Sequence, residues 1–194
     1  MTAYVETMET LRAHRRRIAE LQEEMRQAQK AIEPQPVEDY LFMAMGGPVR
    51  LSSLFGGKTD LFVIHNMGRS CAYCTLWADG FNGVIHHLEN RAAFVLTSPD
   101  DPETQAAFAA ARGWRFRMVS HQGSSFAEDM GYRRDGKWRA GVSVFKRDGA
   151  RIVRVSDTGF DEGDDFCATW HLLDLLPEGK AGWAPKRNYG PNAR

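Results

Sequence analysis

The sequence predicts an α/β fold in which a mixed central sheet carries helices on both faces. Short apolar runs alternate with segments of helical periodicity through the middle of the chain, which is typical of strands joined by helices. Asp148-Gly149, between two β-branched runs, then predicts an antiparallel hairpin. Finally, two cysteines with the spacing CxxC stand directly between a strand-like run and a helix-like one.

Residues 1–36 are expected to form an N-terminal helical extension. A stripe at heptad spacing runs along residues 5–32 and consists of Leu11, His14, Ile18, Leu21, Met25, Ala28 and Ile32. The other positions are highly charged, and Pro34 and Pro36 end the helix. Because such a stripe has to be covered, we expect it to help form the interface of a homodimer. Packing of the helix on the body of its own chain is the alternative.

Residues 37–178 are expected to form the α/β domain. Gly46-Gly47-Pro48 predicts a small β-hairpin, and a short helical turn follows at 52–58. The next elements alternate: strand 61–65, helix 73–90 with a kink near Gly80 and Gly83, strand 93–97, helix 102–112 capped by Asp101 or Ser98, and strand 116–119. A hairpin of 142–146 with 151–155 and a last helix over 162–176, stopped by Pro177, close the domain. Residues 179–194 lack any period and are expected to form an irregular tail.

The composition excludes several classes of function. Lys plus Arg and Asp plus Glu both number 25, so no overall field attracts nucleic acid or anionic lipid. No run approaches the roughly 20 apolar residues of a membrane-spanning helix, and the first residues do not form a secretory signal. We therefore predict a cytoplasmic protein that binds neither nucleic acid nor membrane. In that compartment a catalytic disulfide is more plausible than a structural one.

Cys71 and Cys74 are the most informative residues of the chain. Residues three apart share a helix face with Cβ atoms roughly 5–6 Å apart, and a modest tightening of the first turn reaches the roughly 3.5–4.5 Å that a disulfide needs. The helix start also offers unpaired N–H groups and the positive end of the helix dipole, which stabilise a thiolate. A strand, a short turn and a dithiol at a helix start form the layout of a thioredoxin-like redox site. We predict that Cys71 attacks and Cys74 resolves, with no metal and no cofactor.

Two other interpretations of the pair remain open. One is half of a zinc site, although Cys167 is the only other cysteine and no second CxxC or His-x3–5-His group is present. The other is a pair of reduced structural thiols on a scaffold without chemistry. In that case the protein is a non-catalytic binding module.

Several further segments of the chain form a pattern together with the dithiol. They are Asp39-Tyr40-Leu41-Phe42, Pro48 to Gly57, Cys71-Ala72-Tyr73-Cys74, Trp77 to Gly83, Gly113-Trp114-Arg115-Phe116, Phe126 with Asp129, Gly141 to Phe145, and Leu172 to Pro177. In these segments the sequence resembles a bacterial thioredoxin-like family catalogued as domain of unknown function 899. The resemblance covers nearly the whole chain. The family is described as a predicted dithiol-disulfide oxidoreductase, which implies a thiol or disulfide substrate, on a protein or a small molecule.

The chain departs from thioredoxin itself at two places. Ala72-Tyr73 replaces the Gly-Pro pair between the cysteines, and no proline occurs between Pro102 and Pro177. The cis-proline that usually faces the dithiol is therefore missing, and Val142 or a neighbour is expected in its place. These departures leave general protein-disulfide reductase activity open.

A peroxiredoxin-like thiol peroxidase is the alternative enzyme. Cys74-Thr75 at the helix start would then match a peroxidatic cysteine followed by threonine, and Cys74 would become the sulfenic acid. Cys71, however, stands where such enzymes keep a threonine that orients the thiolate.

Four more residues near the dithiol have both a structural and a functional interpretation. Trp77 either packs in the core or touches substrate, and Asp79 is either a helix-surface or turn-capping aspartate or an acid that assists Cys74. His65 either is a core histidine hydrogen-bonded to the backbone or tunes the pKa of the dithiol. Cys167 is expected to be a buried, inert thiol.

Overall fold

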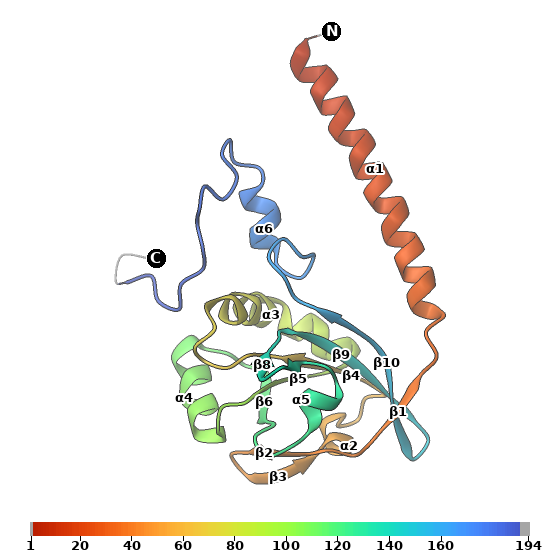
Figure 1. Cartoon of the computed structure of the whole chain (residues 1–194), viewed down its shortest axis with the longest axis vertical. Helices are drawn as coiled ribbons and strands as arrows, with labels where there is room; N and C mark the ends of the chain where they lie inside the picture. Colours follow the sequence, from red (N-terminus) through yellow and green to blue (C-terminus); the bar gives the residue numbers. More distant parts are fainter. Residues whose placement is uncertain (1, 191–194) are drawn as a thin grey trace. The chain divides into compact units, whose positions relative to one another are not determined.

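The computed structural model describes residues 2–190 and divides into two compact units (Figure 1). The first ends at Pro34 and the second begins at Gln35. The first unit is the helix α1 (Ala3–Lys30), which confirms the predicted N-terminal helix. Two ion pairs between residues three apart, Arg17–Glu20 and Arg26–Glu23, lie along its surface. No residue of α1 is buried.

The second unit contains a mixed sheet of eight strands. In chain order these are β1 (Gln35–Val37), β2 (Leu41–Ala44), β3 (Gly47–Arg50), β4 (Asp60–His65), β5 (Ala93–Ser98), β6 (Arg117–Ser120), β9 (Gly141–Asp148) and β10 (Arg151–Gly159). Their order across the sheet is β1-β10-β9-β4-β5-β6-β2-β3. The neighbours β4, β5 and β6 run parallel, and the other neighbouring pairs are antiparallel. The mixed central sheet predicted from the sequence is confirmed.

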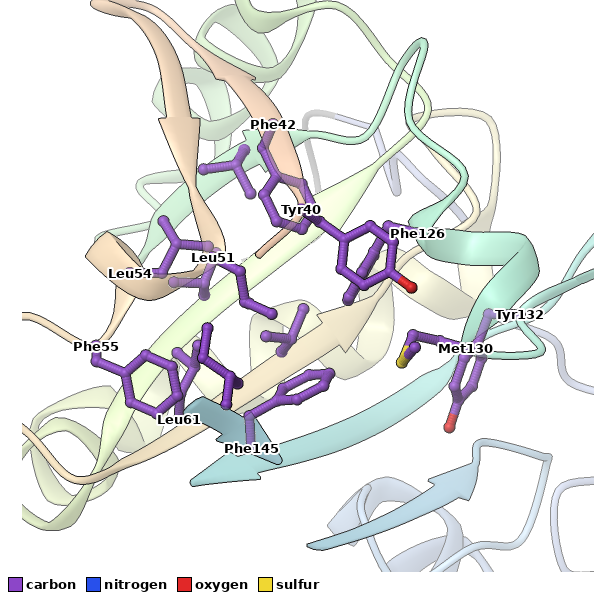
Figure 2. Close-up of a cluster of buried hydrophobic side chains, with 14 residues drawn as sticks. Tyr40, Phe42, Leu51, Leu54, Phe55, Leu61, Phe126, Met130, Tyr132 and Phe145 are labelled. Carbon is purple, nitrogen blue, oxygen red and sulfur yellow. The ribbon is translucent and has the colours of Figure 1, made fainter. Parts of the chain in front are cut away.

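The strands place alternate side chains in two cores, one on each face of the sheet. On β4, Leu61 and Val63 enter the first core, whereas Phe62 and Ile64 face the second. The first core, drawn in Figure 2, is closed by α2 (Leu51–Leu54) and α5 (Phe126–Asp129). The second is closed by α3 (Ala72–Arg91), α4 (Pro102–Arg112) and α6 (Ala168–Leu173). Helices therefore cover both faces, as predicted.

The ends of α4 follow from its sequence. The Asp101 carboxylate accepts the N–H of Thr104 at 2.8 Å, so Asp101, not Ser98, is the N-cap. Gly113 ends the helix with φ of 67°, a left-handed conformation that glycine adopts without strain. The longer helix α3 continues through Gly80 and Gly83 without a break.

The last helix is shorter than predicted, and its expected start at residue 162 is wrong. The Asp164 carboxylate accepts the N–H of Asp161 at 3.2 Å and that of Phe166 at 2.9 Å, which folds this segment into a turn. α6 begins only after Cys167. The helical spacing of 162–167 is thus overridden by a local side-chain hydrogen-bond pattern.

Four short elements were not predicted from the sequence. These are β1, α5 and the two strands of a separate hairpin, β7 (Arg133–Arg134) and β8 (Lys137–Trp138). β1 pairs with β10 and lies across the boundary expected after residue 36. Residues 191–194 of the expected tail lie outside the described residues. Between residues 2 and 190, no helix is both long and apolar enough to cross a membrane.

Candidate functional site

The two cysteines lie at the start of α3, directly after the loop that connects it to β4. The connecting loop is held by two side chains: Asn66, which accepts the N–H of Gly68 at 2.8 Å, and Asp100, which accepts the N–H of Arg69 at 2.8 Å. Gly68 has φ of +98°, and a Cβ there would approach an oxygen of Asp100 to 3.1 Å. Glycine therefore lets the loop press against Asp100, which fixes where Cys71 begins the helix.

Cys71 is the N-cap of α3. Its Sγ accepts the backbone N–H of Cys74 at 3.0 Å, a capping bond that a sulfur provides in place of the usual hydroxyl or carboxylate. The Sγ of Cys74 accepts the N–H of Met67 at 3.5 Å. Cys71 is half-buried and Cys74 is only 3% exposed, and both are free thiols, as is Cys167. The structure therefore brings the predicted pair together at the helix start, with Cys71 partly exposed and Cys74 covered.

The pKa values of the two thiols are shifted in opposite directions. A hydrogen bond from the Cys74 thiol, helped by the backbone N–H groups of Cys74 and Tyr73, lowers the pKa of Cys71 to about 7, although burial opposes this. The pKa of Cys74 is raised, first because Cys74 donates that hydrogen bond, and also because of its burial and the neighbouring Cys71 charge. The thiolate is the reactive form of cysteine. The arrangement therefore favours Cys71 as nucleophile and holds Cys74 as the protonated partner.

A groove of about 610 Å³ opens next to the first turns of α3, although neither cysteine is among the residues that line it. Met67 and Tyr73, which flank the two cysteines in sequence, line it together with residues of the β7–β8 hairpin and of the segment after β10. Its walls carry aromatic rings and charges of both signs, among them Trp77, Trp138, Arg134, Arg139, Asp157 and Glu162. The Tyr73 hydroxyl donates to Glu162 at 3.0 Å, and Glu162 also pairs with Lys180. The first turn of α3 is thereby tied to the segment after β10, which also lines the groove.

Two of the neighbouring residues have mainly structural contacts. Trp77 is 4% exposed, donates its Nε1–H to Asp164 at 3.3 Å and also lines the groove, so it packs in the core and has an edge available to a ligand. Asp79 accepts the Nε1–H of Trp114 at 2.8 Å and forms an ion pair with Arg112. Asp79 thus fastens α3 to the end of α4, and its carboxylate is committed to these donors instead of Cys74.

His65 belongs to the core on the opposite side of the sheet from Cys74. Its ring stacks on Tyr132, with the ring centroids 3.7 Å apart, and its Nε2 lies 2.9 Å from the Ser143 hydroxyl. Burial keeps the pKa of His65 well below its usual value, so the ring is neutral. His65 is therefore a core histidine, as expected, but its hydrogen bond is to the Ser143 side chain and not to the backbone.

Cys167 lies in the second core, which also contains Cys74 and Trp170, and is 4% exposed. This burial agrees with the predicted inert thiol. Among residues 2–190, no three His, Cys, Asp or Glu side chains form a group that could hold a metal ion.

The groove residues of the β7–β8 hairpin were missed by the sequence analysis, although a signal was present. Asp135-Gly136 joins the two strands, and both residues have positive φ, at 51° and 71°. An Asp-Gly pair is a strong indicator of a two-residue hairpin turn. The residues that flank this pair are mostly charged and lack the alternation of apolar residues that predicts strands, so the hairpin was not recognised.

Comparison with known protein families identifies the chain. The model of the family described as "Bacterial protein of unknown function (DUF899)" matches residues 1–190. The chain belongs to this family. The resemblance to this family that the sequence indicated is therefore confirmed. A comparison with curated proteins finds no match.

Several solved structures similar to this DUF899 protein are peroxiredoxins. Reduced Prx3 from Vibrio vulnificus is 12% identical, with a TM-score of 0.57 over 69% of this chain and 89% of that chain. Peroxiredoxin Q from Xanthomonas campestris is 17% identical, with a TM-score of 0.55 over 68% and 87%. Peroxidoxin BcpB from Mycobacterium tuberculosis is 23% identical, with a TM-score of 0.50 over 66% and 82%. At these identities the likeness establishes the thioredoxin-like fold.

Proposed function

We propose that this DUF899 protein is a thiol-disulfide oxidoreductase in which Cys71 attacks and Cys74 resolves. The observation that carries the proposal is the hydrogen bond of 3.0 Å from the Cys74 N–H to the Cys71 sulfur. It stabilises a thiolate on the partly exposed cysteine while its partner stays buried and protonated. The thioredoxin-like fold, which positions a dithiol at a helix start, supports the proposal.

The reaction has two exchange steps. The Cys71 thiolate attacks a sulfur of the substrate disulfide, a mixed disulfide forms, and the first substrate sulfur leaves as a thiolate. Cys74 then gives up its proton, and its sulfur attacks the Cys71 sulfur, which releases the second substrate thiolate and forms the Cys71–Cys74 disulfide. The substrate gains two electrons and the dithiol loses two. An external thiol is needed to reduce the pair again, and the same steps in reverse oxidise a substrate dithiol.

The groove next to the first turns of α3 is our candidate for the substrate site. Its aromatic walls suit the apolar part of a protein segment or of a small molecule, and its charges of both signs suit polar groups nearby. We take the substrate to be a disulfide on either kind of molecule. A cytoplasmic location, where such a pair is kept available for catalysis, is part of the proposal.

Thiol trapping tests the proposal directly. Full-length Cys74→Ser protein, mixed with oxidised glutathione or a disulfide peptide, should accumulate a mixed disulfide that mass spectrometry locates on Cys71. Cys71→Ser protein should accumulate none, and Cys167→Ser is the matched control because it removes a third thiol, buried like Cys74, and should leave exchange intact. Adducts on Cys167 and never on Cys71 would contradict the assignment.

The same variants test the peroxidase alternative, which requires Cys74 to react first. Burial to 3% exposure and a raised pKa both oppose a Cys74 thiolate. Rapid consumption of hydrogen peroxide that survives Cys71→Ser but not Cys74→Ser would establish the peroxidase and overturn our proposal. Unaltered function of a Cys71→Ser, Cys74→Ser protein in the cell would support a non-catalytic binding module.

A further inference from the structure

The helix α1 carries an apolar stripe that the redox site does not use. Its side chains Leu11, Ile18, Leu21 and Met25 are between 43% and 69% exposed, and no residue of the helix is buried. With 28 residues, α1 is much longer than an average helix of a globular protein. An exposed stripe on so long a helix needs a covering surface.

The stripe has heptad positions that can be assigned residue by residue. Leu11, Ile18 and Met25 occupy position a, and His14, Leu21 and Ala28 occupy position d. Two positions that flank the seam, both of type g, carry opposite charges, Arg17 and Glu24. The charges also form two blocks along the helix. The first is basic, with Arg12 and Arg15 to Arg17, and the second is acidic, with Glu20, Glu23 and Glu24.

We propose that α1 pairs with α1 of a second copy of this chain as an antiparallel coiled coil. The two-fold axis crosses the helix between Ile18 and Leu21. The proposal is independent of the proposed redox function.

Side-chain size supports the antiparallel direction. In an antiparallel pair each a position meets a d position of the other helix, so Ile18 packs on the partner's Leu21. In the outer layers, Leu11 faces the partner's Ala28, and Met25 faces the partner's His14. Each of these layers therefore sets a long, flexible side chain against a smaller or stiffer one. A parallel pair would instead set alanine on alanine and histidine on histidine, with a gap in one layer and two imidazoles in another.

Charge supports the same direction. In an antiparallel pair the g positions face each other, so Arg17 meets the partner's Glu24, and two-fold symmetry makes this contact twice. The arginine block as a whole then lies along the glutamate block of the partner. In a parallel pair g faces e, Arg17 and Glu24 both face glutamines, and the like-charged blocks run side by side. Charge complementarity therefore selects a second copy in the opposite direction.

Charge reversal on the full-length protein tests both the partner and the direction. Arg17→Glu or Glu24→Arg alone places like charges together at two symmetric contacts, and should weaken dimerisation about tenfold at low ionic strength, as measured by sedimentation equilibrium. The double variant Arg17→Glu, Glu24→Arg restores both contacts and should return the Kd to within about threefold of the original. Arg16→Glu, at the outward position f, is the matched control and should leave the Kd unchanged.

The design separates the contact between copies from effects within one helix. Arg17 also lies 3.4 Å from Glu20 of its own helix, a pair that the double variant does not restore. Recovery in the double variant therefore reports the intermolecular contact. A protein that is monomeric at micromolar concentration, a Leu21→Glu variant that stays dimeric, or single reversals that leave the Kd unchanged would each overturn the proposal.

Discussion

Replacing Gly141 with alanine should destabilise the second unit strongly. A Cβ at this position would lie 2.3 Å from Cε1 of Tyr132 and 2.5 Å from the carbonyl oxygen of Thr158. Tyr132 is 5% exposed, and its hydroxyl shares its one proton between the carbonyls of Val142 at 3.1 Å and Thr158 at 3.0 Å. The ring cannot retreat without losing this shared hydrogen bond and its stacking on His65.

The magnitude follows from two contributions. Overpacking in a filled core costs about 1–3 kcal/mol, and displacement of the Tyr132 hydroxyl costs about 1 kcal/mol for its one shared hydrogen bond. We therefore expect a loss of about 2–4 kcal/mol in the free energy of unfolding, or roughly 10 °C in the melting temperature for a unit of this size.

Urea and thermal unfolding, followed by circular dichroism, measure this loss. Gly159→Ala is the matched control, because Gly159 lies directly opposite Gly141 across β9 and β10 and its nearest neighbour to a Cβ is 3.8 Å away. It should change the free energy of unfolding by less than about 1 kcal/mol. Equal losses in the two variants would refute the close approach of Tyr132. Combining Gly141→Ala with Tyr132→Ala should cost less than the sum of the two single changes.

Two further predictions concern side chains with buried partners. Asp79→Ala removes the acceptor of the Trp114 and Arg112 donors and should lower the free energy of unfolding by about 1–3 kcal/mol. Asp60→Ala breaks an ion pair whose other partner, Arg91, is 75% exposed, and should cost less than about 1 kcal/mol; equal costs would contradict the role given to Asp79. Burial lowers the pKa of His121 to about 4 from an ordinary 6.5, so its neutral form contributes stability that is fully present above about pH 6.5 and declines as the pH falls towards 4, by up to about 3 kcal/mol. His121→Asn should flatten this decline in urea titrations between pH 7 and 4, and an unchanged slope would refute the assignment to His121.

The sequence predicted the elements whose signals are local. The alternation of β4, β5 and β6 with α3 and α4 follows from apolar periodicity, and Asp101 and Gly113 mark the ends of α4. The CxxC spacing placed Cys71 and Cys74 at the start of α3 because the helix geometry itself brings residues three apart together.

What the sequence could not predict depends on partners far away along the chain. β1 becomes a strand only because it pairs with β10, more than a hundred residues later. Asp79 is fixed by Trp114 and Arg112, and no local pattern announces that contact. The groove likewise joins the start of α3 to the β7–β8 hairpin and the segment after β10, so its walls could be recognised only once the sheet was assembled.

The pH dependence of alkylation at each cysteine tests the central claim most directly. Full-length reduced protein is treated briefly with iodoacetamide at a series of pH values, and mass spectrometry reports the labelled fraction of Cys71, Cys74 and Cys167 separately. Because the thiolate is the reactive form, labelling of Cys71 should rise through a midpoint near its pKa of about 7. Cys74, whose pKa is raised, should stay unlabelled well above that pH. Labelling of Cys74 ahead of Cys71, or a Cys71 midpoint at the ordinary thiol value of about 9, would contradict the account.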